Sequence, residues 1–580
     1  MSIVRSRLWG MAPHWSPRSL PELLRVARKR SACLSLPQVR HHGVHERVCR
    51  LSRCATLMAA TAETRTVSRR RVLVAAAGTA AWGALSGCAS RGSGPAPVAD
   101  EHLFFAKSTT PSAKKMLPHY FPQLPRSLDN VPPRSVVGSG AGDYYDDQLL
   151  RVSGENGTHV AYGGYLRDRP LPRAPLPDDY ELADLKWEIQ AAQAMGADGF
   201  FGDIMGYSGR GWVTLQKLVD AANELGSGFF IVPMIDTSGG GGAMGALTPE
   251  QVAAGLAPFL GKPSTYLEDG KLFLSCFAGE NWTNDRWRAV FAAITAQHGL
   301  QVAFAGSLLD SNQANVDRLA EISEYLGGWM LRADPAVMNA PDLQVARAPR
   351  WARATGCKWV GTAHTQIVTP YTQHYFDEAA NSGALRASWE KIIRDRCEHV
   401  QNVTWNDFSE GGQVVPSVAR GWCQLALTAY YAQKWKHGVA PTITSDCVFL
   451  SHRDQPLDAD YQFGRAAPMT QTESSALSPL QDNVEALSYL TAPAEITVSI
   501  NGIGQPPYAA PAGEYVRTFP NVVTTGSNRH SVSYSRRGQV LGSVESPFPV
   551  TSSPIAQDRQ YFFVSTLHGV EQQYYPLQSV

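Results

Sequence analysis

Between residues 113 and 436 the sequence alternates short β-rich runs with amphipathic stretches, and this alternation limits the possible folds more than any other feature. In ELADLKWEIQAAQAMGAD, apolar residues recur at helical spacing until Gly196 ends the helix. In TPEQVAAGLAPFLG, Thr248 is placed to cap a helix that closes at Gly261. The expected strands are Lys115–Tyr120, Gly199–Ile204, Gly228–Asp236, Lys271–Phe277, Gln301–Ala305, Gly328–Leu331, Lys358–Ala363 and Val400–Trp405.

Eight strands, each followed by a helix, predict an α/β fold of the (β/α)8 TIM-barrel type over residues 113–438. A doubly wound sheet is the alternative. However, no GxGxxG motif follows the first strand, and a long excursion, 129–179, separates that strand from its helix. Barrels often have such excursions on their catalytic face, so the barrel is favoured.

Helical periodicity ends after Gly438, and residues 439–580 alternate apolar and polar residues in short runs such as AEITVSING and HSVSYSRRG. Turn signals occur at Asn501-Gly502 and Arg537-Gly538. This pattern predicts an all-β, sandwich-like C-terminal domain packed against the barrel.

Upstream of the folded part, SRRRVLVAAAGTAAWGALSGCAS predicts an export signal over residues 58–88. Three arginines precede sixteen uncharged residues, too few for a comfortable transmembrane helix. The Ser-Arg-Arg start resembles a twin-arginine signal, and LSGC resembles a bacterial lipobox. That resemblance implies lipidation at Cys88 and a lipid anchor there as the protein's only membrane contact. A signal without lipidation is the alternative.

Such a signal works near an N-terminus, and Met58 lies a suitable distance upstream of it. Residues 1–57 are therefore interpreted as an untranslated or disordered leader, and the Gly/Pro/Ser-rich range 89–112 as a linker. The protein is expected on the outer face of a bacterial cell membrane, or secreted.

The charge balance argues against a nucleic-acid partner. Residues 88–580 hold 37 of the 52 basic and 48 of the 51 acidic residues, a net charge near −11. The cysteines after Cys88 show no CxxC spacing, so we expect no metal site, and buried free thiols with one possible bridge. No nucleotide motif is present, and we expect no cofactor.

Acids, histidines and tryptophans recur where the expected strands end. In a barrel these positions meet at the catalytic face. Aromatic rings stack on pyranose rings and carboxylates bond sugar hydroxyls, so we expect a carbohydrate site there. Structural hydrogen bonding is the alternative for each residue, and for Asp310 it is the expected role. The candidates for substrate binding are His119, Asp203, Asp236, Glu280, Trp282, His364, Trp405 and Asn406, and the last strand also ends in a pair of acids, Asp407 and Glu410.

The segment VTWNDFSEGGQ, 403–413, is similar to the TWNDYGES signature of glycoside hydrolase family 71, the α-1,3-glucanases or mutanases. The resemblance extends, in the family's order, to LPHYFPQLPRSLDN, LADLKWEIQAAQAMGADGFFGDIMG, GFFIVPMIDTS and YLEDGKLFLSCFAGENW. It implies a barrel that hydrolyses α-1,3-glucosidic bonds of α-glucan with inversion, using the Asp and Glu of the motif, which match Asp407 and Glu410.

Inverting hydrolysis suits such a pair, because it needs one protonated carboxyl and one carboxylate about 6.5–9.5 Å apart, with a water between. Glu410 is assigned as general acid and Asp407 as base, with the reverse as an alternative. Phe408-Ser409 and Gly411-Gly412 depart from the family's Tyr-Gly and Ser-His, so the loops that face substrate differ. A carbohydrate-binding lipoprotein without turnover, a structural envelope protein and a hydrolase of another α-linked polysaccharide are the competing functions.

Overall fold

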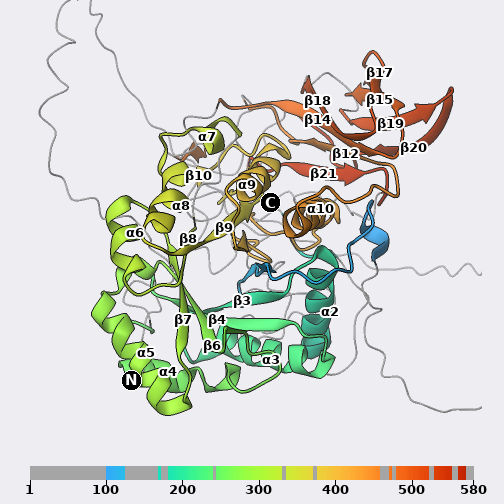
Figure 1. The fold of residues 1–580 in the computed structure, drawn as a ribbon. Helices are drawn as coiled ribbons and strands as arrows, with labels where there is room; N and C mark the ends of the chain where they lie inside the picture. Colours follow the sequence, from blue (N-terminus) through green and yellow to red (C-terminus); the bar gives the residue numbers. More distant parts are fainter. Residues whose placement is uncertain are drawn as a thin grey trace, which may run out of the picture. The chain divides into compact units, whose positions relative to one another are not determined.

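The structure, a computed structural model, describes the chain from Asp100 to Gly569 with gaps, and Figure 1 shows it as a ribbon. The described ranges are 100–123, 168–171, 180–238, 243–329, 335–369, 375–457, 469–472, 479–521, 528–551 and 559–569. The expected leader 1–57, the signal 58–88 and Cys88 lie outside these ranges. No helix within them is long and apolar enough to cross a membrane.

Between Lys115 and Val403 the described chain contains a curled sheet of parallel strands with helices around it (Figure 1). Its strands are β1 (Lys115–Met116), β2 (His119–Tyr120), β3 (Gly199–Ile204), β4 (Phe230–Asp236), β6 (Lys271–Phe277), β7 (Val302–Leu308), β8 (Tyr325–Gly328), β9 (Lys358–His364) and β11 (His399–Val403). A short antiparallel strand, β5 (Leu267–Glu268), pairs with the start of β6. The mixed α/β fold is therefore confirmed, and each expected strand is present to within a few residues.

The strand order, β1-β11-β9-β8-β7-β6-β4-β3-β2, brings the two ends of the sheet back to one short segment. β1 and β2 are separated only by Leu117-Pro118, so one strand in two pieces pairs with β11 on one side and with β3 on the other. The Leu117 N–H donates to the Val400 carbonyl at 2.8 Å, and the Phe201 N–H donates to the Pro118 carbonyl at 3.0 Å. A doubly wound sheet has two separate edges, and this order does not fit it.

Helices follow the strands in the order that the sequence pattern predicts. Thr248 caps its helix as expected: its hydroxyl accepts from the Gln251 N–H at 3.3 Å, and the Gln251 side chain accepts from the Thr248 N–H at 2.9 Å. Gly196 follows the last residue of its helix with φ near +96°, a conformation that glycine adopts at low cost. The helices are α2 (Tyr180–Met195), α3 (Gly209–Leu225), α4 (Pro249–Gly255), α5 (Asn284–His298), α6 (Gln313–Ala320), α7 (Pro335–Asn339), α8 (Gln344–Ala354), α9 (Gly383–Arg394) and α10 (Cys423–His437).

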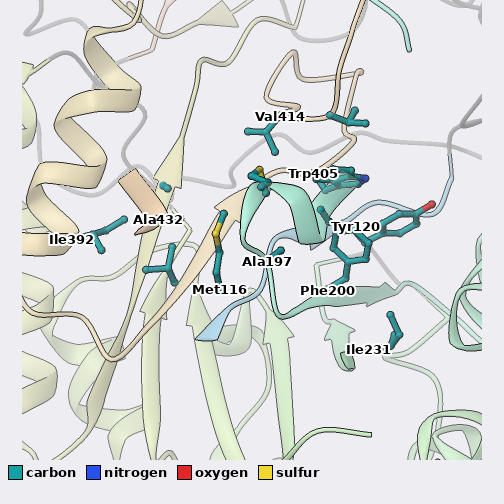
Figure 2. Close-up of a cluster of buried hydrophobic side chains, with 14 of the residues drawn as sticks. Met116, Tyr120, Ala197, Phe200, Ile231, Ile392, Trp405, Val414 and Ala432 are labelled. Atoms are coloured by element: carbon teal, nitrogen blue, oxygen red, sulfur yellow. The ribbon is translucent and has the colours of Figure 1, made fainter. Parts of the chain in front are cut away.

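The two faces of the curled sheet bury separate sets of apolar side chains. The inner face contributes a cluster that includes Phe201, Met234 and Phe273. The outer face packs against the helices, and Figure 2 shows part of that larger cluster, with Phe200 and Trp405 among its members. Because strand side chains alternate between faces, the inward residues at the strand ends are those in step with the inner cluster.

Two antiparallel sheets follow α10 and share one hydrophobic cluster, which includes Val448, Val484, Val498 and Val532. The predicted all-β region is therefore confirmed for the described residues. The predicted turns at Asn501-Gly502 and Arg537-Gly538 join strands, and all four residues have positive φ. One sheet contains β12 (Cys447–His452), β14 (Asn483–Leu490), β18 (Gly513–Pro520) and β21 (Phe562–Ser565); the other contains β15 (Ala494–Ile500), β16 (Ile503–Gly504), β17 (Tyr508–Ala510), β19 (Ser531–Arg536) and β20 (Gln539–Glu545). We call these two sheets the β module.

The described part of the expected linker 89–112 is packed against the rest of the chain. Phe104 is fully buried, and its ring lies 4.5 Å from that of Tyr489 and 5.5 Å from that of Tyr430. Its carbonyl accepts from the Thr444 N–H at 2.9 Å. This part of the chain therefore joins α10 to the β module, because its aromatic side chains are large enough to be buried between them.

Two segments between β9 and α9, 365–369 and 375–382, contact the β module, and the second does so through a buried charge pair. Glu378 is fully buried, and one of its carboxylate oxygens lies 3.1 Å from Nη2 of Arg453, whose side chain is 3% exposed. The Tyr561 hydroxyl donates to the other oxygen at 2.8 Å. A short strand pair, β10 (Tyr375–Phe376) with β13 (Thr470–Gln471), adds main-chain contacts. The β module therefore contacts the end of the curled sheet where the strands finish.

A partly buried charge, Glu268, lies at the opposite end of the sheet, where the strands begin. The two carboxylate oxygens of Glu268 accept from the hydroxyls of Tyr266 and Tyr325. The His399 ring nitrogen lies 3.6 Å away, and Lys358 donates to the Tyr325 hydroxyl at 2.8 Å. His399, and after it the two hydroxyls, hold the pKa of Glu268 near 2 against the opposing effect of burial. The ionised carboxylate therefore stabilises the inside of the sheet.

Glu268→Gln is expected to lower the free energy of unfolding by about 1–3 kcal/mol at pH 7, because the amide cannot replace a charged acceptor. Since the folded-state pKa is below the ordinary value of 4.5, this contribution is complete above pH 4.5 and declines as the pH falls toward 2. Urea unfolding of both proteins between pH 7 and pH 3 measures the difference. The control is Glu224→Gln, which removes the exposed partner of Lys186. A difference between wild type and Glu268→Gln that does not shrink on acidification would contradict the assignment.

Candidate active site

Three adjacent strands, β2, β3 and β4, bring polar side chains to one inner surface at their carboxyl ends. His119 lies at the end of the first strand, and its Nε2 is 3.7 Å from Oδ2 of Asp203 on β3. Asp236, the last residue of β4, is in step with the inner residue Met234. The His119 ring also meets the ring of Trp329, which follows β8, edge to face at 4.7 Å. The predicted residues His119, Asp203 and Asp236 therefore lie together.

Burial dominates the electrostatics of the two aspartates. Asp203 is 4% exposed and Asp236 5% exposed. Burial raises the pKa of Asp203 to about 8. Burial, and then the proximity of Asp203 as a second acid, raises the pKa of Asp236 to about 7, although the N–H and hydroxyl of Ser238 donate to it at 2.7 and 2.6 Å. Near neutral pH, Asp203 is protonated and can both donate and accept a hydrogen bond.

Asp407 and Glu410 lie on a closed loop, residues 404–414, that follows β11; we call it the acid loop. The Thr404 N–H donates to the Gly412 carbonyl at 3.1 Å, and the Val414 N–H donates to the Thr404 carbonyl at 3.1 Å. These bonds join the two ends of the loop. The loop therefore has a fixed shape that does not depend on a regular helix or strand.

The acid loop also begins at a fixed point on the first strand. The Trp405 N–H donates to the His119 carbonyl at 2.8 Å. The Asn406 amide pairs with the peptide group of Phe121, accepting at 2.8 Å and donating at 3.0 Å. The loop that contains both predicted acids is thereby attached to the segment that contains His119.

The two predicted acids differ in their surroundings. Asp407 is 7% exposed, and its Oδ1 accepts from the N–H and hydroxyl of Ser409 and from the Glu410 N–H, the two N–H bonds being 2.9 and 3.3 Å long. Glu410 is half-buried, and its carbonyl accepts from the Val368 N–H at 2.8 Å. Asp407 is therefore an oriented acceptor, and Glu410 is the more accessible of the two side chains.

The other predicted site residues make contacts within the chain. The Trp405 ring is fully buried on the outer face of the sheet beside Phe200, as Figure 2 shows. The two oxygens of Glu280 accept from the N–H groups of Asp310 and Leu309 at 2.7 and 3.2 Å. Trp282 lies under the Arg286 guanidinium, 4.1 Å from the ring centre. These three side chains and the Asn406 amide therefore support loops, and the structure does not bring them to the surface shared by His119 and Asp203.

His364 and Asp310 complete the set of strand-end residues. His364 is the last residue of β9 and is 1% exposed, and its main-chain N–H donates to the Ser388 hydroxyl at 3.3 Å. Asp310 is exposed and accepts from the side chains of Asn312 and Gln344. Its expected role as a loop acceptor is confirmed.

Sequence reasoning missed several residues at this end of the sheet. Trp329 directly follows β8, whereas the expected strand Gly328–Leu331 placed it inside a strand and away from the strand ends. Arg420 and Asp168 are each 1% exposed and contact the acid loop, but neither belongs to a periodic pattern or motif. Their roles depend on contacts between segments far apart in the sequence.

Comparison with known proteins identifies the class. Glucan endo-1,3-alpha-glucosidase from Schizosaccharomyces pombe is 22% identical over 406 residues, which cover 66% of this chain and 90% of that protein. A mutanase from Penicillium rubens is 21% identical over 421 residues, covering 67% and 86%. Among solved structures, a GH99 endo-alpha-mannosidase from Bacteroides thetaiotaomicron is 14% identical over 55% of this chain and 97% of that one, with a TM-score of 0.40.

These sequence relatives, taken with the acids at the strand ends, define the chain as a glycoside hydrolase. The sequence model of glycosyl hydrolase family 71 matches residues 177–566, more than half of the chain. The chain belongs to that family, and the resemblance found at residues 403–413 is confirmed.

The raised pKa of Asp203 predicts a pH-dependent stability. The folded state keeps the Asp203 proton up to about pH 8, whereas the unfolded chain releases it near pH 4, so the free energy of unfolding falls as the pH rises between these values. Asp203→Asn removes this loss. Relative to wild type, the variant is expected to gain at least about 1 kcal/mol between pH 4.5 and pH 8, the equivalent of one pKa unit.

Urea unfolding at several pH values measures the effect, with Asp285→Asn, an exposed acid on α5, as the control that should show no trend. A constant difference between Asp203→Asn and wild type across this range would show that Asp203 is ionised in the folded protein.

Proposed function

We propose that this chain hydrolyses α-1,3-glucosidic bonds of α-glucan by an inverting mechanism, with Asp407 and Glu410 as its two catalytic acids. The observation that carries the proposal is the position of both acids on one closed loop beside His119, at the carboxyl ends of parallel strands. The names of the family 71 relatives support the α-1,3 linkage of the proposed substrate.

In the proposed reaction, Glu410 protonates the glycosidic oxygen as its bond to the anomeric carbon breaks. Asp407 accepts a proton from a water that attacks that carbon from the other ring face. The accessibility of Glu410 suits contact with a leaving sugar, and the three donors on Asp407 suit a carboxylate of fixed orientation. The reverse assignment of the two roles is the alternative.

The sugar would be bound mainly by His119, Asp203, Asp236 and His364. A protonated Asp203 can donate to one sugar hydroxyl and accept from another, while the Trp329 ring beside His119 offers an aromatic face. Of the other predicted contacts, Glu280, Trp282, Trp405 and Asn406 are proposed to act through the loops that they support.

The proposed organisation is a (β/α)8 barrel over residues 113–438 with a β-sandwich over 439–580. The cyclic strand order and the shared core of the β module support it. Export through residues 58–88 and lipidation at Cys88 would place the enzyme on the outer face of a bacterial membrane, where an insoluble polysaccharide is accessible. The support for this part is the sequence alone.

Incubation of the full chain with insoluble α-1,3-glucan, followed by a reducing-sugar assay, tests the activity. Asp407→Asn and Glu410→Gln are each expected to lower the rate by about 10²–10⁴-fold, the usual contribution of a general acid or base. Asp310→Asn is the matched control, because Asp310 follows a strand of the same sheet and its side chain accepts from Asn312 and Gln344. The bond to Glu280 comes from the Asp310 main-chain N–H, which the substitution keeps. NMR of the first product should show the β anomer.

Equal sugar release by wild type, Asp407→Asn and Glu410→Gln would overturn the catalytic assignment. Binding of the glucan without release from any α-glucan would favour the carbohydrate-binding lipoprotein. A product of retained configuration would overturn the inverting mechanism alone.

A further inference from the structure

A buried arginine, Arg420, binds the second half of the acid loop, after Glu410. The Arg420 side chain is 1% exposed. One of its terminal nitrogens donates to the Gly411 carbonyl at 2.6 Å, and the other donates to the Gln413 carbonyl at 2.9 Å. A planar guanidinium with donors in a fixed fork holds two carbonyls at a defined separation. Arg420 therefore sets the distance between two points of the loop directly after Glu410.

Asp168 holds Arg420 and the loop at the same time. Its Oδ2 lies 3.8 Å from Nε of Arg420 and accepts from the side-chain amide of Gln413. Its Oδ1 accepts from the Ala419 N–H at 2.9 Å, so the residue before Arg420 is also attached. A charge pair this deeply buried is costly unless hydrogen bonds compensate it. The two terminal nitrogens of Arg420 and the two oxygens of Asp168 make such bonds to the acid loop and to Ala419.

The backbone of Gly411 requires glycine. Its φ is near +63°, and a Cβ placed there would lie 2.5 Å from Cγ2 of Val368. The next carbonyl, of Gly412, accepts from the Thr365 hydroxyl at 3.2 Å. The Gly-Gly pair that departs from the family motif thus lets the chain turn its carbonyls toward Arg420 on one side and the segment 365–369 on the other.

Glu410 lies between these two attachments. The Val368 N–H donates to the Glu410 carbonyl at 2.8 Å, and Arg420 donates to the carbonyl of the next residue, Gly411. The Glu410 side chain leaves a main chain that is fixed on both sides. Proton transfer to a leaving oxygen is sensitive to displacements of less than about 1 Å, so this fixation affects the reaction directly.

We infer that Arg420 is a positioning residue for catalysis: it holds the Gly411 and Gln413 carbonyls so that the carboxyl groups of the acid loop stay aligned with the glycosidic bond. This inference rests on the proposed catalytic role of Asp407 and Glu410. Arg420 acts through the loop and does not touch substrate.

Arg420→Lys tests the inference, because an ammonium keeps the charge but cannot bond both carbonyls in the geometry of the guanidinium. The rates are measured on two soluble α-1,3-linked oligoglucosides, one with a sugar as leaving group and one with 4-nitrophenol. A poor leaving group needs protonation and a good one needs it far less. We expect kcat to fall about 10–100-fold for the sugar leaving group and no more than about threefold for nitrophenol.

The ratio of the two rates separates positioning from a structural effect, because a smaller folded fraction lowers both rates by the same factor. The matched control is Arg536→Lys. Arg536 also bonds two main-chain carbonyls, of Ala492 and Pro493, and an aspartate, Asp446, but it does so within the β module. Its ratio should equal that of wild type.

If Arg420→Lys does not fold, Asp168→Asn replaces it, since the amide keeps the shape and removes the charge beside Nε. It is expected to change the ratio in the same direction by a smaller factor. A wild-type ratio in either folded variant would overturn the inference. No turnover by wild type on either substrate would overturn the proposed function and this inference with it.

Discussion

The strand Lys115–Tyr120 joins the two ends of the curled sheet, and the candidate active site depends on this connection. Its first half pairs with β11 and its second half with β3, so the last strand of the sheet is held beside the first. His119 is the next-to-last residue of this strand, and its carbonyl accepts from the Trp405 N–H at the start of the acid loop. His119 and the two predicted acids are nearly 300 residues apart in sequence, yet this bond fixes the start of the acid loop directly beside His119.

The sequence predicted most of the fold and the inward acids because both follow from local periodicity. Asp203 and Asp236 come directly after buried strands, and side-chain alternation places them inside the sheet. The same alternation would have placed Trp405 inside, in step with Val403. Regular pairing of β11 ends at Val403, and the Trp405 ring packs outside against Phe200. Side-chain alternation predicts which face a residue occupies only where the strand is paired regularly with its neighbour.

Contacts between distant segments were not predictable from one sequence. Nothing in PSVARGWC indicates that its arginine binds the acid loop, since Arg420 and Asp168 are about 250 residues apart. The residues 89–112 have the composition of a linker at their start, but the apolar run around Phe104 is buried by tertiary packing. In each case the position of the side chain depends on how distant elements pack together, and no local sequence pattern indicates that packing.

The buried pair of Glu378 and Arg453 restricts how this architecture can be recombined. The two charges face each other across the contact between residues 375–382 and the β module, and the Tyr561 hydroxyl bonds the same carboxylate. Separating the two parts at residue 438 would leave the Glu378 carboxylate on one piece and the Arg453 guanidinium on the other. Each piece would then hold a charge without its ionic partner, which is destabilising. Replacing either part with a different domain would therefore have to preserve both sides of this pair.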